Sequence, residues 1–347
     1  MKEKASLRKE LLQSLFPTGI PRLWCPLVTH YTEGGVIDFS RMAAQFHYVF
    51  PDAEGFLMPS STGDGWKLDN EKTIQIVDFA VSMSQETGCH LLLAVLKPDA
   101  ESTKNSIDAM LRFFREKTGI DDTAECLNAI NVRGFAVCPP SECNDQEIIY
   151  KELSTVADLG IPIALYQIPF ITRSEIAPST FHALVEKYQN IFLLKDSSGN
   201  DLIARSFGHR KNVFLVRGAE GDYVKWLKDN GGPYDGFLLS TANSFAGELN
   251  VIIDYIERGA FPAADTLSHA ISCVNKEINT LTNSLHSGNL FAATVKTVDH
   301  FYAFGPRAAG REGPLLHGGT RLPAEIITAA GQILKRYDLM PARGYLG

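Results

Sequence analysis

Short apolar runs alternate with amphipathic segments from Leu23 to Arg258. Each run is apolar almost throughout, which is typical of parallel strands whose two faces are both buried. The segments between the runs have helical spacing, as where Ile74, Val77 and Val81 fall on one face. The pattern therefore predicts a parallel sheet in which a helix follows every strand. The expected strands are residues 23–29, 55–59, 90–95, 134–138, 162–166, 191–195, 213–218 and 236–240.

Two α/β folds have this order of elements, an open doubly wound sheet and a closed (β/α)8 TIM barrel. Eight consecutive strand–helix units, with no dinucleotide-type glycine loop after the first strand, favour the barrel. A barrel of this kind needs about 250 residues, so the chain has room for additions at both ends.

Three regions are expected along the chain. Residues 1–19 form an N-terminal helical extension, because Leu7, Leu11 and Leu15 recur on one helical face before Pro17. Residues 20–260 form the catalytic barrel. Residues 261–347 lack strands and form a C-terminal helical region, within which residues 304–323 are too rich in glycine and proline to be helical.

The bulk composition is that of an ordinary globular protein, with 347 residues, 45% hydrophobic and 21% charged. The net charge of −7 argues against a nucleic-acid or anionic-membrane partner. No apolar run is long enough to span a bilayer, and the charged N-terminus lacks the apolar core of a secretory signal. The six scattered cysteines contain no C-x-x-C pair and are typical of reduced thiols, so we expect a soluble, cytoplasmic protein.

Candidate catalytic residues stand at the carboxyl ends of the strands, where the active site of such a barrel lies. Lys195 ends the sixth strand. Burial there would lower the pKa of this lysine and leave a neutral amine, which can attack a carbonyl to form a Schiff base. The alternative is that the lysine side chain leaves the strand end for solvent. Tyr166 ends the fifth strand and is a candidate general acid/base, or else a core tyrosine whose hydroxyl meets a backbone carbonyl.

A cluster of hydroxyl and amide donors, Ser60-Ser61-Thr62-Gly63, follows the second strand. Ser61 and Thr62 offer donors suited to a carboxylate; the alternative is an ordinary turn that caps the next helix. The strand ends carry no pair of acids for glycoside hydrolysis, and the chain has no metal-binding, Walker or G-x-S-x-G motif. We therefore expect no metal and no cofactor, and carbonyl chemistry through an imine.

At these positions the chain resembles the dihydrodipicolinate synthase / N-acetylneuraminate lyase family of Schiff-base-forming class I aldolases. Four family motifs occur in the family's order, each at a strand end, at residues 60–64 (SSTGD), 166–169 (YQIP), 195–199 (KDSSG) and 236–243 (GFLLSTAN). The resemblance covers about Leu23 to Pro323.

The resemblance implies that Lys195 forms the imine with pyruvate or a related 2-oxo acid and that Tyr166 transfers protons. It implies that Ser61 and Thr62 hold the substrate carboxylate, and that further residues line the rest of the substrate, namely Ser197, Gly218 and Ser240. It also implies a homo-oligomer, a tetramer or a dimer.

Departures from the family pattern bear on the second substrate. The synthases carry a Pro-Tyr-Tyr segment where this chain has Pro139-Pro140-Ser141, and an arginine where Ile171 stands, two residues before Arg173. Both differences argue against lysine biosynthesis. The neuraminate lyases carry acidic residues after the seventh strand, where only Glu220 is comparable.

The leading hypothesis is an aldolase that makes or breaks a carbon–carbon bond of a 2-oxo acid. A sugar-acid dehydratase with the same lysine imine, a carbon–oxygen lyase, is an alternative, as is dihydrodipicolinate synthase itself. A catalytically silent binding or regulatory barrel is the alternative outside the enzymes.

Overall fold

The computed structural model describes residues 2–207, 212–285 and 288–347. Its centre is a closed barrel of eight parallel strands in sequence order, with β1 pairing both β2 and β8. The predicted (β/α)8 TIM barrel is thereby confirmed. The strands are β1 Leu23–Cys25, β2 Gly55–Met58, β3 His90–Val95, β4 Val132–Val137, β5 Ile163–Gln167, β6 Ile191–Asp196, β7 Phe214–Arg217 and β8 Gly236–Leu238.

Helices cover the outside of the barrel, as the apolar runs buried on both faces require. The apolar side chains on their inner faces join those on the outer face of the strands in one large buried cluster. These elements are α2 Phe39–Val49, α3 Asn70–Thr87, α4 Ala100–Thr118, α5 Thr123–Ala129, α6 Gln146–Ala157, α7 Pro169–Thr172, α8 Pro178–Lys187, α9 Leu202–Phe207, α10 Tyr223–Trp226, the 3₁₀ helix η1 Lys228–Asn230 and α11 Ala242–Glu257.

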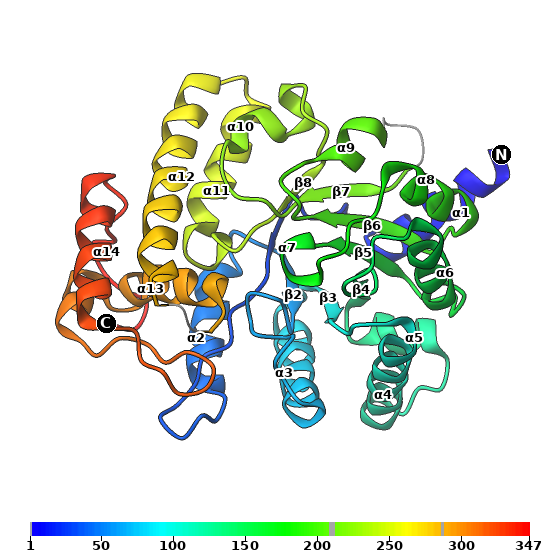
Figure 1. Ribbon diagram of the computed structural model, residues 1–347, viewed down its shortest axis with the longest axis horizontal. Helices are drawn as coiled ribbons and strands as arrows, with labels where there is room; N and C mark the ends of the chain where they lie inside the picture. The colour runs from blue at the N-terminus through cyan, green and yellow to red at the C-terminus, as the bar shows by residue number, and fades with distance from the viewer. Residues whose placement is uncertain (1, 208–211, 286–287) are drawn as a thin grey trace.

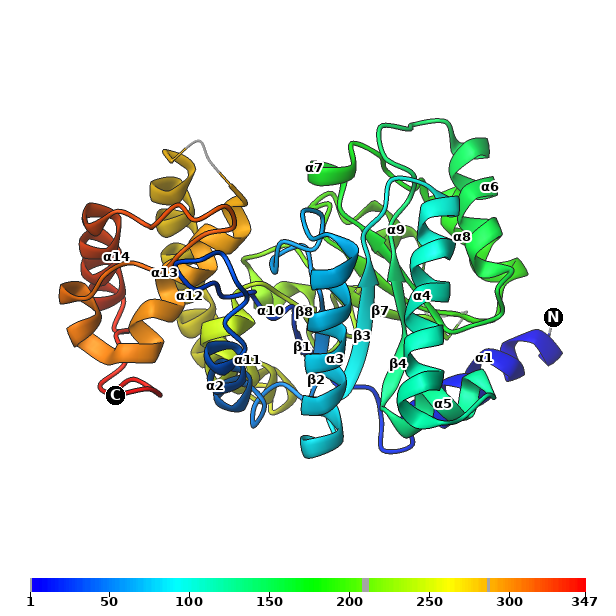
Figure 2. The ribbon, with the colours of Figure 1, turned by 90° about the horizontal axis from the view of Figure 1, so that it is seen from below.

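The two ends of the chain lie on opposite sides of the barrel (Figures 1 and 2). The C-terminal region is helical, as expected, and packs on the barrel through the contact of α11 with α12. It consists of α12 Phe261–Asn283, α13 Leu290–Phe304, the 3₁₀ helix η2 Gly305–Gly310 and α14 Ala324–Arg336. The division into domains at residues 19 and 260 remains a prediction.

The N-terminal extension forms α1 (Lys2–Leu15) and closes the amino end of the barrel. After the helix, the ring of Phe16 enters the barrel interior, with its centroid 6.2 Å from that of Trp24 and 6.0 Å from that of Phe192. The buried guanidinium of Arg8 donates hydrogen bonds to the carbonyl oxygens of Tyr188 and Ile191, each at 2.8 Å. The extension is thus part of the folded barrel.

Two details of the sequence prediction are wrong. The first strand, expected over residues 23–29, is three residues long. In the segment 304–323, residues Gly305–Gly310 form a 3₁₀ helix, since a proline in the first turn removes no helical hydrogen bond. Asn243, in the first turn of α11, accepts from Val28 N and donates to Pro26 O, which joins the start of this helix to the segment after β1.

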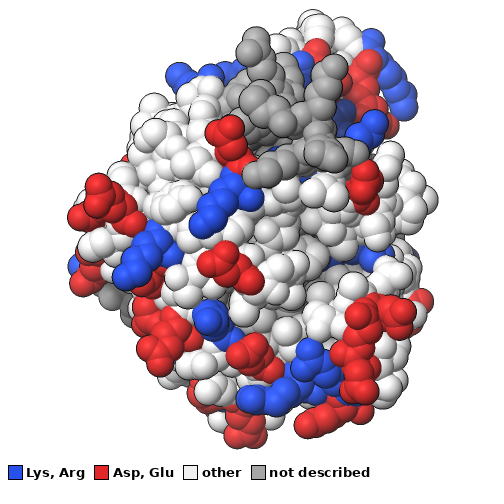
Figure 3. Space-filling model, turned by 90° about the vertical axis from the view of Figure 1, so that its right-hand side faces the viewer, with Lys and Arg blue, Asp and Glu red and all other residues white. Residues whose placement is uncertain are grey.

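The surface on the side of α1 carries Lys and Arg interspersed with Asp and Glu (Figure 3). All six cysteines are free thiols. Among the described helices, none combines the length and the apolar character that crossing a membrane requires.

Candidate active site

The strand register places Lys195 beside Tyr166. β5 and β6 are parallel neighbours in which these two residues are opposite each other. Both side chains are buried, at 4% and 2% exposure, and Lys195 Nζ lies 4.0 Å from the centroid of the Tyr166 ring. The alternative that Lys195 turns to solvent is therefore wrong.

The surroundings of Lys195 favour its neutral amine. Burial lowers the pKa of Lys195 from 10.5 to about 7, while Cys138, Glu220 and Cys25 oppose this shift through their negative charges when ionised. A far larger share of this lysine is therefore neutral at pH 7 than of a lysine in water, whose pKa is 10.5. The amine is therefore available as a nucleophile at neutral pH.

The phenol of Tyr166 has the opposite shift. Burial raises its pKa far above the ordinary value, Cys138 adds to the rise, and the hydroxyls of Ser197 and Ser61 offset part of it. The groups that affect this phenol through hydrogen bonding are the side-chain hydroxyls of Ser197 and Ser61, in contrast to the backbone carbonyl that the core-tyrosine alternative expects. Tyr166 therefore keeps its proton at neutral pH.

The loop after β2 carries the expected hydroxyls into the same region. Thr62 Oγ1 is 2.9 Å from Ser240 Oγ at the end of β8. The hydroxyl of Ser61 is buried, and among the described residues it has no hydrogen-bond partner of normal geometry. The loop does not cap the next helix, because α3 begins at Asn70 with Asp69 as its N-cap. The helix-capping alternative is therefore wrong.

Gly218, directly after β7, leaves space for the side chains of Ser197 and Lys195. A Cβ atom at Gly218 would lie 2.1 Å from Ser197 Oγ and 3.0 Å from Lys195 Cε. Only a glycine leaves this space, so the residue is required by the packing around the lysine. The predicted site residues on β2, β5, β6, β7 and β8 thus meet at the carboxyl end of the barrel, while their roles remain predictions.

Cys138 and Glu220 also belong to this region. Cys138 directly follows β4 and is buried, and burial raises the pKa of its thiol well above the usual value. Its position at the end of an expected strand could have identified it from the sequence. The Glu220 carboxylate accepts hydrogen bonds from the backbone and hydroxyl of Thr241, at 3.1 and 2.7 Å, and from Tyr223 at 3.0 Å. It thereby joins the β7 and β8 loops.

The residues that depart from the family pattern differ in exposure. Ile171 on α7 is partly buried and packs against the barrel interior. Arg173 is exposed, with 75% of its side chain accessible, and it forms an ion pair with Glu142 at 3.1 Å. This guanidinium is directed to the surface and leaves the predicted substrate region without an arginine from α7.

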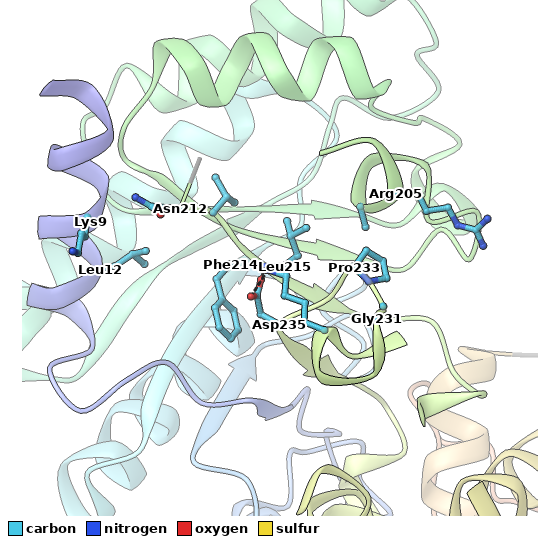
Figure 4. A pocket seen from close by; sticks show the side chains of 13 residues that line it. Lys9, Leu12, Arg205, Asn212, Phe214, Leu215, Gly231, Pro233 and Asp235 are labelled. Carbon is cyan, nitrogen blue, oxygen red and sulfur yellow. Dashed lines mark hydrogen bonds and ion pairs between the residues drawn. The ribbon is translucent and has the colours of Figure 1, made fainter. Parts of the chain in front are cut away.

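A cavity of about 760 Å³ lies elsewhere, between α1 and the amino ends of β7 and β8 (Figure 4). Its lining includes Lys9, Phe214 and Asp235 and none of the predicted site residues. Because Phe214 begins β7 and Lys195 lies near the end of β6, this cavity is at the face opposite the lysine.

The family model described as the dihydrodipicolinate synthetase family matches residues 20–297. The curated relatives include 4-hydroxy-tetrahydrodipicolinate synthases from Prosthecochloris aestuarii, 27% identical over 71% of this chain and 77% of the relative, and from Lactococcus lactis, 26% identical over 72% and 78%. Similar solved structures include the E. coli protein YagE in complex with pyruvate (TM-score 0.71, 16% identity, 92% of this chain and 99% of that one) and a 2-keto-3-deoxygluconate aldolase variant from Sulfolobus solfataricus (TM-score 0.69, 14% identity, 92% and 96%).

Proposed function

The chain belongs to the dihydrodipicolinate synthetase family, and we propose that within it Lys195 forms a Schiff base with pyruvate or a related 2-oxo acid. The family supplies the enzyme class, a class I lyase of the Schiff-base-forming type. The assignment of individual residues is our proposal. The observation that carries it is the buried Lys195 amine, with a pKa of about 7, beside the protonated phenol of Tyr166.

The reaction begins with attack of the neutral Lys195 amine on the keto carbon. Tyr166 donates a proton to the carbinolamine oxygen, which leaves as water and gives the iminium ion. Ser61 and Thr62 hold the carboxylate of the 2-oxo acid with their donors. The Tyr166 phenolate then takes a proton from the adjacent carbon, which gives an enamine. The enamine adds to an aldehyde carbonyl, whose oxygen receives the proton back from Tyr166, and water hydrolyses the product iminium to return free Lys195. Cleavage is the reverse of these steps.

Two observations favour carbon–carbon chemistry with a partner other than the substrate of lysine biosynthesis. The surface position of Arg173 and the apolar Ile171 offer no cation for a second carboxylate. The oxygens of Glu220 already accept hydrogen bonds from Thr241 and Tyr223, which disfavours a role for this carboxylate in binding the sugar hydroxyls of a neuraminate-type substrate. We place the protein in the cytoplasm as a homo-oligomer, a tetramer or a dimer.

Borohydride trapping with pyruvate, followed by peptide mapping, tests the proposal. Mapping is needed because a second buried lysine, Lys296, has its pKa lowered by burial to about 8. We expect the reduced adduct on Lys195 and none after Lys195→Met, while the exposed control Lys151→Met traps normally. Absence of an adduct on Lys195 with several 2-oxo acids would refute the proposal, and so would an adduct confined to Lys296.

A further inference from the structure

The first turn of α13, in the C-terminal region, reaches the loop that carries Ser61. Asn289 Nδ2 donates a hydrogen bond to the carbonyl oxygen of Ser61 at 2.7 Å and another to Asp64 Oδ1 at 3.1 Å. Its Oδ1 accepts from Phe291 N and Ala292 N, which caps the helix. One side chain therefore begins α13 and holds the loop after β2.

The loop is also held from β1 through Asp64. This residue is buried and has a φ of +64°, and its second carboxylate oxygen accepts from the hydroxyl of Tyr31 at 3.1 Å. The ammonium of Lys296, also on α13, lies 4.4 Å from the centroid of the Tyr31 ring and donates to the carbonyl oxygen of Leu315 at 2.8 Å. Asp64 is thus fixed between α13 and the segment after β1.

The helix is a firm support for Asn289, because it packs on the segment that follows β1. Val28 forms a small buried cluster with Ala292 and Val295 in the first two turns of α13. Asn289 therefore bridges an anchored helix to the loop.

The planar peptide between Ser61 and Thr62 links the hydrogen bond from Asn289 to the orientation of the Thr62 N–H. In a trans peptide, the carbonyl of one residue and the N–H of the next point in opposite directions. The Ser61 carbonyl oxygen accepts from Asn289 Nδ2 at 2.7 Å and, within the loop, from Asp64 N at 3.2 Å. The Thr62 N–H of the same peptide therefore points to the side opposite these two donors. Among the described residues, this N–H has no hydrogen-bond partner, and the Ser61 hydroxyl, which lies beside the Tyr166 phenol, has none of normal geometry, so both can donate to a ligand.

We propose that Asn289 is a positioning residue for the substrate carboxylate, acting through the peptide between Ser61 and Thr62. The inference rests on the proposed function, since it requires a 2-oxo acid bound at Lys195. It assigns part of the substrate-binding geometry to the C-terminal helical region, 228 residues along the chain from Ser61.

Two variants separate this role from helix capping. Asn289→Ser and Asn289→Asp keep an oxygen that caps α13 but remove the Nδ2 donor. We expect the pyruvate concentration that half-saturates borohydride trapping to rise about tenfold for Asn289→Ser, the effect of one lost hydrogen bond. It rises further for Asn289→Asp, whose carboxylate lies beside that of Asp64. The limiting trapping rate at saturating pyruvate stays within about twofold of the parent, because Lys195 and Tyr166 are untouched.

A neutral probe and a matched asparagine complete the experiment. Pyruvamide has the same keto group without the carboxylate, and we expect the Asn289 variants to trap it as the parent does. Asn190→Ser is the control, because Asn190 donates to the carbonyl oxygens of Ala157 and Ile161 at the amino end of β6. It leaves pyruvate saturation unchanged.

The outcomes distinguish the two proposals. An unchanged pyruvate dependence in Asn289→Ser would overturn the positioning role, as would an equal loss with pyruvate and pyruvamide, which indicates general damage to the fold. A parent protein that traps no 2-oxo acid on Lys195 contradicts the proposed function instead.

Discussion

Replacement of Lys195 by methionine is expected to make the protein more stable while abolishing its chemistry. The methionine side chain has nearly the same length as lysine and no charge, so it fills the same space beside Tyr166. The parent must either bury an ammonium or release its proton on folding, and both cost free energy. The variant is free of that cost.

The pKa of Lys195 sets the size of the effect. With a value of about 7 in the folded protein and 10.5 in the unfolded chain, the cost is at most about 4 kcal/mol at pH 7. Between these two pKa values the unfolded chain binds the proton more tightly than the folded protein does. The stability of the parent therefore rises with pH from about 7 to 10.5 relative to Lys195→Met, and the advantage of the variant disappears near pH 10.5.

Denaturant unfolding of parent and variant at pH 7, 8, 9 and 10 measures this difference, because titrations common to both proteins cancel. The exposed Lys151→Met should differ from the parent by a small amount that is independent of pH. If Lys195→Met is no more stable than the parent at pH 7, or if its advantage does not decline with pH, then burial does not destabilise the Lys195 ammonium and the lowered pKa is refuted.

Three further variants test the surroundings of the lysine and the closed end of the barrel. Tyr166→Phe should lower kcat by about 10²–10⁴-fold through the loss of its proton transfer, with retention of a slowly formed pyruvate adduct; unchanged turnover would contradict the role. Gly218→Ala should slow adduct formation at least tenfold, because its Cβ meets Ser197 and Lys195 Cε, and normal trapping kinetics would show that the site has room. Phe16→Ala should lower the free energy of unfolding by about 3–5 kcal/mol, measured by denaturant unfolding, since the ring fills the barrel interior beside Trp24; a change below about 1 kcal/mol would mean that the extension is not part of the core.

Much of the site could be predicted because it follows from the order of the elements. Parallel strands end at the same edge of the barrel, so residues at the ends of different strands, such as Tyr166 and Lys195, must meet there once eight strand–helix units are recognised. The same rule did not reveal Asn289, which stands at a helix start outside the barrel. Its contact with Ser61 depends on how α13 packs against the segment after β1, and no local sequence pattern predicts that packing.

The sequence by itself determined the barrel, its helical C-terminal region and the identity of the residues at the strand ends, because hydrophobic periodicity and strand order are local properties of the chain. The tertiary structure decided which of the expected side chains are buried at the site and which are engaged by other residues. Burial by many distant residues lowers the pKa of Lys195 to about 7. The packing of the loops places Arg173 at the surface and brings Thr241 to the carboxylate of Glu220. It also brings Phe16 into the barrel and Asn289 to Ser61, contacts that depend on packing between segments far apart in the chain.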